Sequence, residues 1–314
     1  MKTGPAIIEI LKREGVDVII GYPVNPLLEQ AARADIRPVI VRQERTGLHM
    51  ADAISRLSSG KKIGVFAMQH GPGSENAFGG VAQAYADSVP IVVLPMGYAR
   101  RELQVPPNFS SALNFRHVCK SSEQISLGSE TQNVMRRAFT QARNGRPGPV
   151  LVEIPMDVFG EEVADELTYR PTSHRRLGPD PEAVSVAADI LLGAKRPVLY
   201  AGQGVHYAEA WAELRELAEL LAIPVCTSLE GKSAFDESHP LALGCGGRSM
   251  PRTVRHFLDE ADVIFGVGCS FTATAFGVKM PSGKTLVHST LDPLDLDKDV
   301  VSSHAVLGDA RLVL

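Results

Sequence analysis

The sequence predicts an α/β protein built from two consecutive doubly wound parallel-sheet domains. Short continuous runs of valine and isoleucine alternate with longer stretches of helical periodicity. Such apolar runs are typical of strands that are covered on both faces of a parallel sheet. The alternation is interrupted once, at about residues 161–181, where charged residues and prolines gather. We therefore expect a first domain over 1–163, a linker over 164–180 and a second domain over 181–314.

Composition supports two globular domains and excludes several classes of partner. The chain has 314 residues, 44% of them hydrophobic, and a net charge of −4 without a long basic run. Nucleic acid and anionic membranes are therefore poor partners. The N-terminal apolar run is too short and too charged for a signal peptide, and no apolar segment approaches about 18 residues. Four widely spaced cysteines outside any CxxC pattern favour reduced thiols in a cytoplasmic protein.

In the first half, the pattern predicts alternating helices and strands. Helices are expected at 4–16, 27–34, directly after Glu44, and at 74–88 and 130–144; strands are expected at 17–23, 38–41, 62–68, 90–96 and 148–155. The second half repeats the alternation. Its expected helices are 181–194 and 208–222, and its expected strands are 196–202, 223–228, 261–268 and 285–292.

Polar residues gather where these predicted strands end. In parallel sheets, ligands bind beyond the carboxyl ends of the strands. Glu44 follows the strand 38–41, and a Gly-Pro-Gly turn at Gly71–Gly73 follows the strand 62–68. Such a turn brings backbone close to a ligand and aims helix N–H groups at it. An ordinary tight turn with Ser74 as a helix N-cap would give the same pattern.

The order of these motifs carries a resemblance. The segments "IIGYP", "RQE" before a helix, "HGPGSENAFGGVAQAYADSVPIVVL" and "RPGPVLVEIPMDV" resemble the pyrimidine-binding domain of thiamine diphosphate enzymes of the acetolactate synthase and 2-oxo acid decarboxylase superfamily. The segments "KRPVLYAGQGV", "ADVIFGVGCSF" and "VLGDARLVL" resemble the central domain of that superfamily. The resemblance covers essentially the whole chain. It implies a flavodoxin-like first domain and a Rossmann-like second domain.

The resemblance gives Glu44 a chemical role. It implies that Glu44 hydrogen-bonds N1′ of the cofactor's aminopyrimidine. This contact favours the imino tautomer, whose N4′ can take the proton from the thiazolium C2, so that acid–base catalysis is relayed through the cofactor. Without the resemblance, Glu44 would be a helix-start acid worth about 0.3–1 kcal/mol against the helix dipole. The presence of Glu44 argues against a glyoxylate carboligase, whose family has valine there.

Further site residues follow from the resemblance. The implied cofactor-binding positions, besides Glu44, are Pro23, Val24, Asn25, Gln69, Pro72 and Asn76. Val24 and Asn25 stand where acetolactate synthases have small glycines. His70 matches a histidine that relays protons in benzoylformate decarboxylase-like members, which makes it a second catalytic candidate. The alternative for His70 is a loop histidine bonded to backbone.

The second domain carries an incomplete glycine fingerprint. Gly202 and Gly204 follow a strand, but Tyr207 holds the place of the third glycine in GxGxxG. A structural role is therefore favoured, and FAD binding is the alternative. No HExxH or Cys/His pairing predicts a metal site. The family's Mg²⁺-diphosphate domain, with its Gly-Asp-Gly motif, is expected to be absent, because "LGDARL" has Ala310 at the second glycine.

The resulting functional hypothesis is thiamine diphosphate-dependent decarboxylation or carboligation of a small 2-oxo acid, of the acetolactate synthase type. The alternatives are a benzoylformate decarboxylase-like enzyme or 2-hydroxyacyl lyase, a non-catalytic subunit that kept the fold, and a nicotinamide or flavin oxidoreductase. The chain is expected to be a fragment, one subunit of a split enzyme or a non-catalytic relative. We expect a homodimer, a homotetramer or a partner subunit that carries the diphosphate-binding domain and its Mg²⁺.

Overall fold

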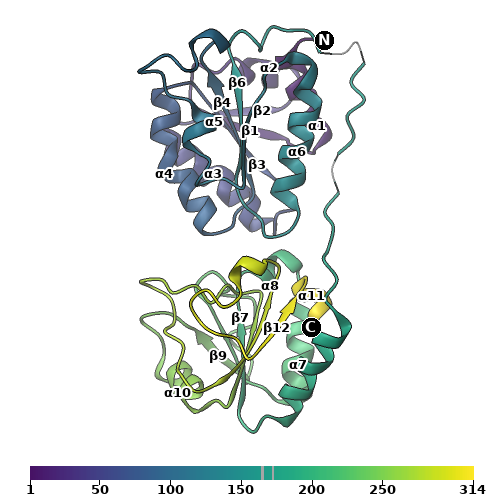
Figure 1. The fold of residues 1–314 in the computed structure, drawn as a ribbon, viewed down its shortest axis with the longest axis vertical. Helices are drawn as coiled ribbons and strands as arrows, with labels where there is room; N and C mark the ends of the chain where they lie inside the picture. The colour runs from purple at the N-terminus through teal and green to yellow at the C-terminus, as the bar shows by residue number, and fades with distance from the viewer. Residues whose placement is uncertain (164–165, 172) are drawn as a thin grey trace. The chain divides into compact units, whose positions relative to one another are not determined.

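The computed structural model describes residues 1–163, 166–171 and 173–314, which divide into two compact units. The units are Met1–Arg175 and Arg176–Leu314 (Figure 1). The linker expected over 164–180 includes residues 164, 165 and 172, which lie outside the described residues.

The first unit contains a six-stranded parallel sheet in the order β2-β1-β3-β4-β6-β5. Its strands are β1 (Val18–Gly21), β2 (Arg37–Ile40), β3 (Gly64–Met68), β4 (Ile91–Gly97), β5 (Ser121–Gln124) and β6 (Val150–Pro155). The first four strands follow the flavodoxin order. All of them are parallel, but β2 is added on one side of β1 and β3 and β4 on the other, so the strand order reverses between β1 and β3. This reversal is the topological switch point, where loops leave the sheet on opposite sides.

Helices cover both faces of this sheet (Figure 1). One face packs against α1 (Thr3–Arg13), α2 (Leu27–Arg33) and α6 (Thr131–Arg143); the other packs against α3 (Glu44–Leu57) and α4 (Pro72–Ala86). Side chains of β3 alternate between the two cores, as the pleat of a strand requires. Val65 belongs to the first core and Phe66 to the second. The continuous apolar runs of the sequence are thus explained by burial on two sides.

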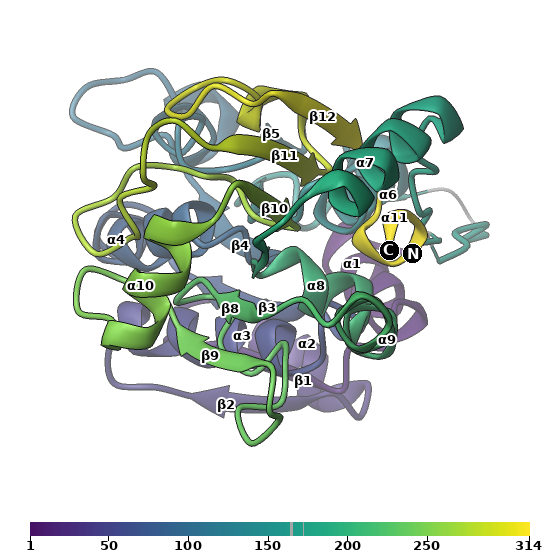
Figure 2. The ribbon, with the colours of Figure 1, turned by 90° about the horizontal axis from the view of Figure 1, so that it is seen from below.

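The second unit contains a six-stranded parallel sheet in the order β12-β11-β10-β7-β8-β9, with most of its strands visible side by side in Figure 2. Its strands are β7 (Pro197–Ala201), β8 (Val225–Thr227), β9 (Ala242–Cys245), β10 (Val263–Val267), β11 (Thr285–Thr290) and β12 (His304–Leu307). This is the Rossmann order, with its switch point between β7 and β10. The prediction of two doubly wound parallel sheets is confirmed.

Helices of the second unit are also divided between two cores. One core contains residues of α7 (Pro181–Gly193), α8 (Gly204–Ala208), α9 (Trp211–Leu221) and α11 (Ala310–Val313). The other contains residues of α10 (Arg252–Glu260). The remaining short helices are α5 (Ser111–Asn114), η1 (Arg100–Glu102), η2 (Gly128–Glu130) and η3 (Pro293–Asp295). Among the helices of the described ranges, none has the length and apolarity that a membrane crossing requires.

The core of the first unit continues beyond β6. Leu167 and Tyr169 are 9% and 2% exposed and belong to the core that covers α1 and α6. The Tyr169 hydroxyl donates a hydrogen bond to the buried carboxylate of Glu14, which also forms an ion pair with Arg143. Arg13 donates to the carbonyl oxygens of Leu167 and Tyr169, each at 2.9 Å. The described residues 166–171 are therefore fixed to the first unit.

Candidate cofactor site

The candidate site lies at the switch point of the first sheet. Three segments leave the carboxyl ends of neighbouring strands there: the loop 22–26 after β1, the start of α3 after β2, and the turn 69–73 after β3. Parallel strands end at one edge of a sheet, so these segments lie together although they are far apart in sequence. They carry most of the site residues that the sequence predicts.

Glu44 is the first residue of α3 and is buried, with 4% of its surface exposed. Within the described part of the chain, no group hydrogen-bonds or pairs with its carboxylate. The N-terminal end of the helix is a favourable place for its negative charge. Its oxygens keep some accessible surface, and a carboxylate without a protein partner retains its full capacity to accept hydrogen bonds. It is therefore a polar group available to a ligand.

Gly73 brings the backbone of α4 against Glu44. A Cβ atom at position 73 would lie 2.6 Å from Gln69 Cγ and 3.5 Å from Glu44 Oε1. Even an alanine would therefore press on the Gln69 side chain and approach the carboxylate. Gln69 and Glu44 thus both lie next to Gly73, at the first turn of α4.

The Gly-Pro-Gly turn has a backbone that glycine adopts most readily. Gly71 is the N-cap of α4, with φ 57° and ψ −115°, and Pro72 is the first helical residue, where its missing N–H costs nothing. The alternative reading of Ser74 as the N-cap is wrong. Ser74 lies inside the first turn, and its hydroxyl donates back to the Gln69 carbonyl at 3.3 Å.

Asn25 ties the loop after β1 to the sheet. Its Nδ2 donates to the carbonyl oxygens of Met68 at 2.8 Å and Leu94 at 3.0 Å, and its Oδ1 accepts from the backbone N–H of Leu27 at 3.0 Å. The side chain is 5% exposed. Both polar ends of the amide are therefore occupied by backbone, and Asn25 shapes the wall of the site through the loop that it holds.

Val24 adopts an unusual conformation at the tip of the same loop. It is 71% exposed and has a φ of 71°, a region that β-branched residues rarely adopt. Such strain costs about 1–3 kcal/mol and persists only where neighbouring contacts enforce it. The Asn25 hydrogen bonds provide that enforcement. Pro23, next to Val24, is also exposed.

His70 packs against an aromatic residue that sequence reasoning missed. The ring centroids of His70 and Tyr98 lie 4.5 Å apart at an interplanar angle of 63°. Tyr98 follows β4, so the strand-end rule that selects Glu44 would also have selected it. The His70 ring forms no hydrogen bond to any residue within the described ranges. Pro72 and Asn76 are exposed on the first turns of α4.

In the second unit, the glycines after β7 serve backbone packing. A Cβ atom at Gly202 would lie 2.3 Å from the carbonyl oxygen of Gly268, and one at Gly204 would lie 2.7 Å from Gly268 Cα. The N–H of Gly204 donates to the Gly268 carbonyl at 2.8 Å. The ends of β7 and β10 are thus pressed together at the second switch point. The absence of a side chain at both glycines is what allows this close approach of main chain to main chain.

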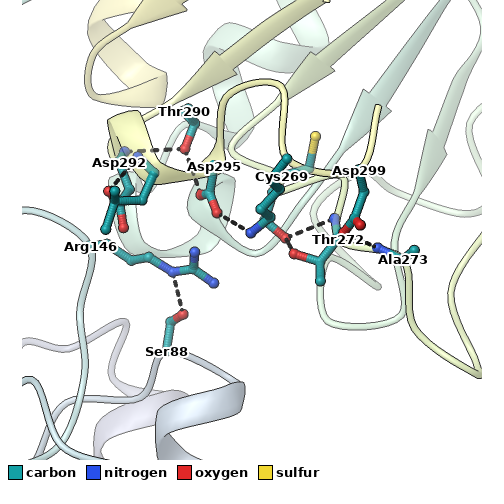
Figure 3. Close-up of polar contacts among 12 residues, drawn as sticks. Ser88, Arg146, Cys269, Thr272, Ala273, Thr290, Asp292, Asp295 and Asp299 are labelled. Atoms are coloured by element: carbon teal, nitrogen blue, oxygen red, sulfur yellow. Dashed lines mark hydrogen bonds and ion pairs between the residues drawn. The ribbon is translucent and has the colours of Figure 1, made fainter. Parts of the chain in front are cut away.

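Polar side chains after β11 are likewise engaged within the second unit (Figure 3). Asp295, 4% exposed, accepts from the Thr290 hydroxyl at 3.0 Å and pairs with Lys298 at 2.6 Å. Asp299 accepts from the Ala273 N–H at 2.8 Å. Across the described residues, no three His, Cys, Asp or Glu side chains gather as metal ligands.

Fold and site together define a two-domain α/β protein with a flavodoxin-order sheet, a buried carboxylate at its switch point and a Rossmann-order domain after it. Comparison with protein families gives the particular group. "Thiamine pyrophosphate enzyme, N-terminal TPP binding domain" matches residues 1–125, and "Thiamine pyrophosphate enzyme, central domain" matches residues 184–314. The chain belongs to the thiamine pyrophosphate enzymes and carries these two domains.

Individual relatives agree with this family. The chain is 36% identical over 329 residues to a Methanocaldococcus jannaschii protein described as "Probable acetolactate synthase large subunit", covering all of the chain and 55% of that protein. It is 33% identical over 326 residues to acetolactate synthase isozyme 3 large subunit of Escherichia coli, covering 98% of the chain and 56% of that protein. The chain thus spans about half the length of these relatives.

A solved structure shares the fold. Benzoylformate decarboxylase from Polynucleobacter necessarius superposes with a TM-score of 0.85 at 24% identity. The match covers 100% of this chain and 60% of that one. Both α/β units therefore have their counterparts in a single known enzyme chain.

Proposed function

We propose that this chain supplies the aminopyrimidine-binding half of a cytoplasmic, thiamine diphosphate-dependent enzyme that decarboxylates a small 2-oxo acid and joins the product to a second carbonyl compound, as acetolactate synthases do. The observation that carries the proposal is Glu44, a buried carboxylate that lacks a protein partner within the described residues and lies at the switch point of the first sheet. The similarity to acetolactate synthase large subunits supports the reaction class.

The residues present fit the cofactor. When bound, thiamine diphosphate supplies a nucleophilic carbon and an electron sink for decarboxylation. Glu44 would hold a proton at N1′ of the aminopyrimidine, and the N-terminal end of α3 would stabilise its negative charge there. Gln69 would contact the ring from the turn, and Pro72 and Asn76 would line its pocket from α4. Pro23 and Val24 would form a further wall, through the loop that Asn25 holds in place.

The rest of the holoenzyme completes the site. We propose that the diphosphate and its Mg²⁺ are held by a further domain, carried by a partner subunit or, in a homodimer or homotetramer of a longer protein that contains this chain, by another protomer. The proposed reaction assigns no role to FAD, because thiamine diphosphate supplies both the nucleophile and the electron sink.

A reconstitution assay tests the proposal. The chain is assembled with its diphosphate-binding part and incubated with 2-oxo acids of increasing side-chain size, with and without thiamine diphosphate and Mg²⁺. We expect CO₂ release that requires both, and a 2-hydroxy-3-oxo acid as the product of carboligation. Cofactor-independent behaviour, or an assembly that binds no thiamine diphosphate, would favour a non-catalytic subunit instead.

A second candidate reaction is decarboxylation with release of an aldehyde, as in a benzoylformate decarboxylase-like lyase. His70 favours it, because an imidazole, which can both donate and accept a proton, lies beside the turn and makes no hydrogen bond to the described part of the protein. If His70 relays protons, His70→Ala is expected to lower decarboxylation by about 10²-fold.

Single-turnover decarboxylation and aldehyde release measure this effect. The exposed His117 provides a control, since His117→Ala removes an imidazole from the same unit without touching the turn. If His70→Ala leaves both rates unchanged, the lyase candidate is wrong and the carboligase remains.

A further inference from the structure

We infer that Glu153 is a positioning residue of the candidate cofactor site, holding the turn 69–73 from strand β6 through helix α5 and two serine hydroxyls. This inference rests on the proposed function for its consequence in catalysis. The link itself is a feature of the first unit. Glu153 is a charged residue inside an otherwise apolar strand, a placement that proteins rarely keep without a partner or a task.

The carboxylate of Glu153 is fully buried and holds the start of α5. Its exposed fraction is 0%. Oε1 accepts from the backbone N–H of Ser111 at 3.0 Å, and Oε2 accepts from that of Ala112 at 3.1 Å. Both carboxylate oxygens are therefore used to fix two consecutive N–H groups of one helix.

Ser111 connects the start of α5 to the turn 69–73. Its hydroxyl donates to the Ser74 hydroxyl at 2.8 Å, and the Ser74 hydroxyl donates to the Gln69 carbonyl at 3.3 Å. Both serines are 0% exposed. The chain of contacts therefore runs without interruption from β6 to the backbone carbonyl of Gln69, whose side chain lies next to Gly73, as the Glu44 carboxylate does.

The surroundings keep the carboxylate in one place. A Cβ atom at Gly97, at the end of β4, would lie 2.9 Å from Glu153 Cγ, so the side chain lies directly over that glycine. Burial raises the pKa of Glu153, while the hydrogen bonds from Ala112 and Ser111 act in the opposite direction. The two N–H donors are thus what makes a carboxylate acceptable at this depth.

The geometry requires two acceptors. Glutamine would present one acceptor and one N–H₂ donor to two N–H groups, so one pair of donors would face each other. Aspartate keeps both acceptors on a side chain shorter by one methylene. Glu153→Gln should therefore displace α5 and loosen the turn, and Glu153→Asp should restore most of the contact.

The experiment uses the reconstituted holoenzyme and measures the thiamine diphosphate concentration for half-maximal activity together with kcat at saturating cofactor. Glu153→Gln and Ser111→Ala are expected to raise that concentration about tenfold, as the loss of one positioning hydrogen bond predicts, with kcat changed less than about twofold. Glu153→Asp is expected to recover to within about threefold of the wild type.

A matched control separates positioning from stability. Ser122 donates to the Ala112 carbonyl at 2.9 Å, so Ser122→Ala removes a hydrogen bond from the same helix without touching the link to Ser74. Its half-saturating cofactor concentration should equal that of the wild type. The double variant Ser74→Ala, Ser111→Ala should raise the half-saturating cofactor concentration no more than either single variant. Both substitutions remove the same hydrogen bond between Ser111 and Ser74.

Amide hydrogen exchange over residues 69–76 measures how firmly Ser111 holds the turn, independently of catalysis. Exchange there is expected to rise in Ser111→Ala and to stay unchanged in Ser122→Ala. Unchanged exchange and an unchanged half-saturating concentration in Ser111→Ala would overturn the inference. Failure of the proposed function would appear differently: the wild type itself would lack cofactor-dependent turnover, and the exchange result would still decide whether Glu153 and Ser111 hold the turn.

Discussion

Replacement of Glu44 by glutamine is expected to lower cofactor-dependent turnover by about 10²- to 10⁴-fold, the range that general acid–base groups contribute. Glutamine keeps the size of the side chain and a hydrogen-bonding end, but it cannot hold or release a proton at N1′. Because Glu44 has no partner among the described protein groups, the substitution breaks no ion pair, and the fold should be retained. The measurement is CO₂ release at saturating cofactor, with circular dichroism to verify folding.

Glu29 provides the control for this substitution. It lies in the first turn of α2, as Glu44 lies in the first turn of α3, but it is exposed and pairs with Arg33. Glu29→Gln removes a helix-start acid outside the site and should leave turnover unchanged. Wild-type turnover in Glu44→Gln would contradict the assigned role and leave Glu44 as a helix-start acid.

Arg143→Ala is expected to destabilise the first unit by about 3–5 kcal/mol, the cost of removing the charged partner of a buried carboxylate. Arg143 pairs with Glu14, whose side chain is 0% exposed. Its guanidinium also lies 5.3 Å from the centre of the Phe139 ring. The loss would weaken the anchor of Tyr169, which donates to the same carboxylate. Urea unfolding followed by hydrogen exchange in α1 and α6 measures the effect for this unit.

The same helix contains the matched control. Arg137 forms an ion pair with Glu123 at 2.7 Å, but its side chain is 52% exposed. Exposed pairs contribute at most about 1 kcal/mol, so Arg137→Ala should change the unfolding free energy far less than Arg143→Ala. Equal effects of the two substitutions would show that burial of the ion pair between Arg143 and Glu14 adds nothing to the unfolding free energy.

The interior of each sheet could be predicted from sequence, whereas three edge strands could not. Strands such as β3 and β10 are buried along their full length, and their valine and isoleucine content reveals them. The missed strands β5, β9 and β12 lie at sheet edges and are only partly buried. The polar sequence "SSEQ" of β5 has no apolar pattern, because pairing with β6 alone places it in the sheet.

The location of a candidate site residue was predictable where its position along the chain decides where it lies in the fold. Glu44 and Gln69 follow strands, so strand-end reasoning finds them. The side-chain contacts of Asn25 could not be predicted, because its partners are carbonyl groups 43 and 69 residues away. Glu153 is recognisable from the sequence, because an acid within the apolar run "PVLVEIP" requires a buried partner.

The packing of Gly202 and Gly204 against Gly268 has a consequence for protein engineering. Each glycine meets main-chain atoms, which cannot rotate away as a side chain can. A designer who wished to place side chains at these two positions could not do so in the present backbone. The connection between β7 and α8 would have to be lengthened first, so that the two strand ends could separate.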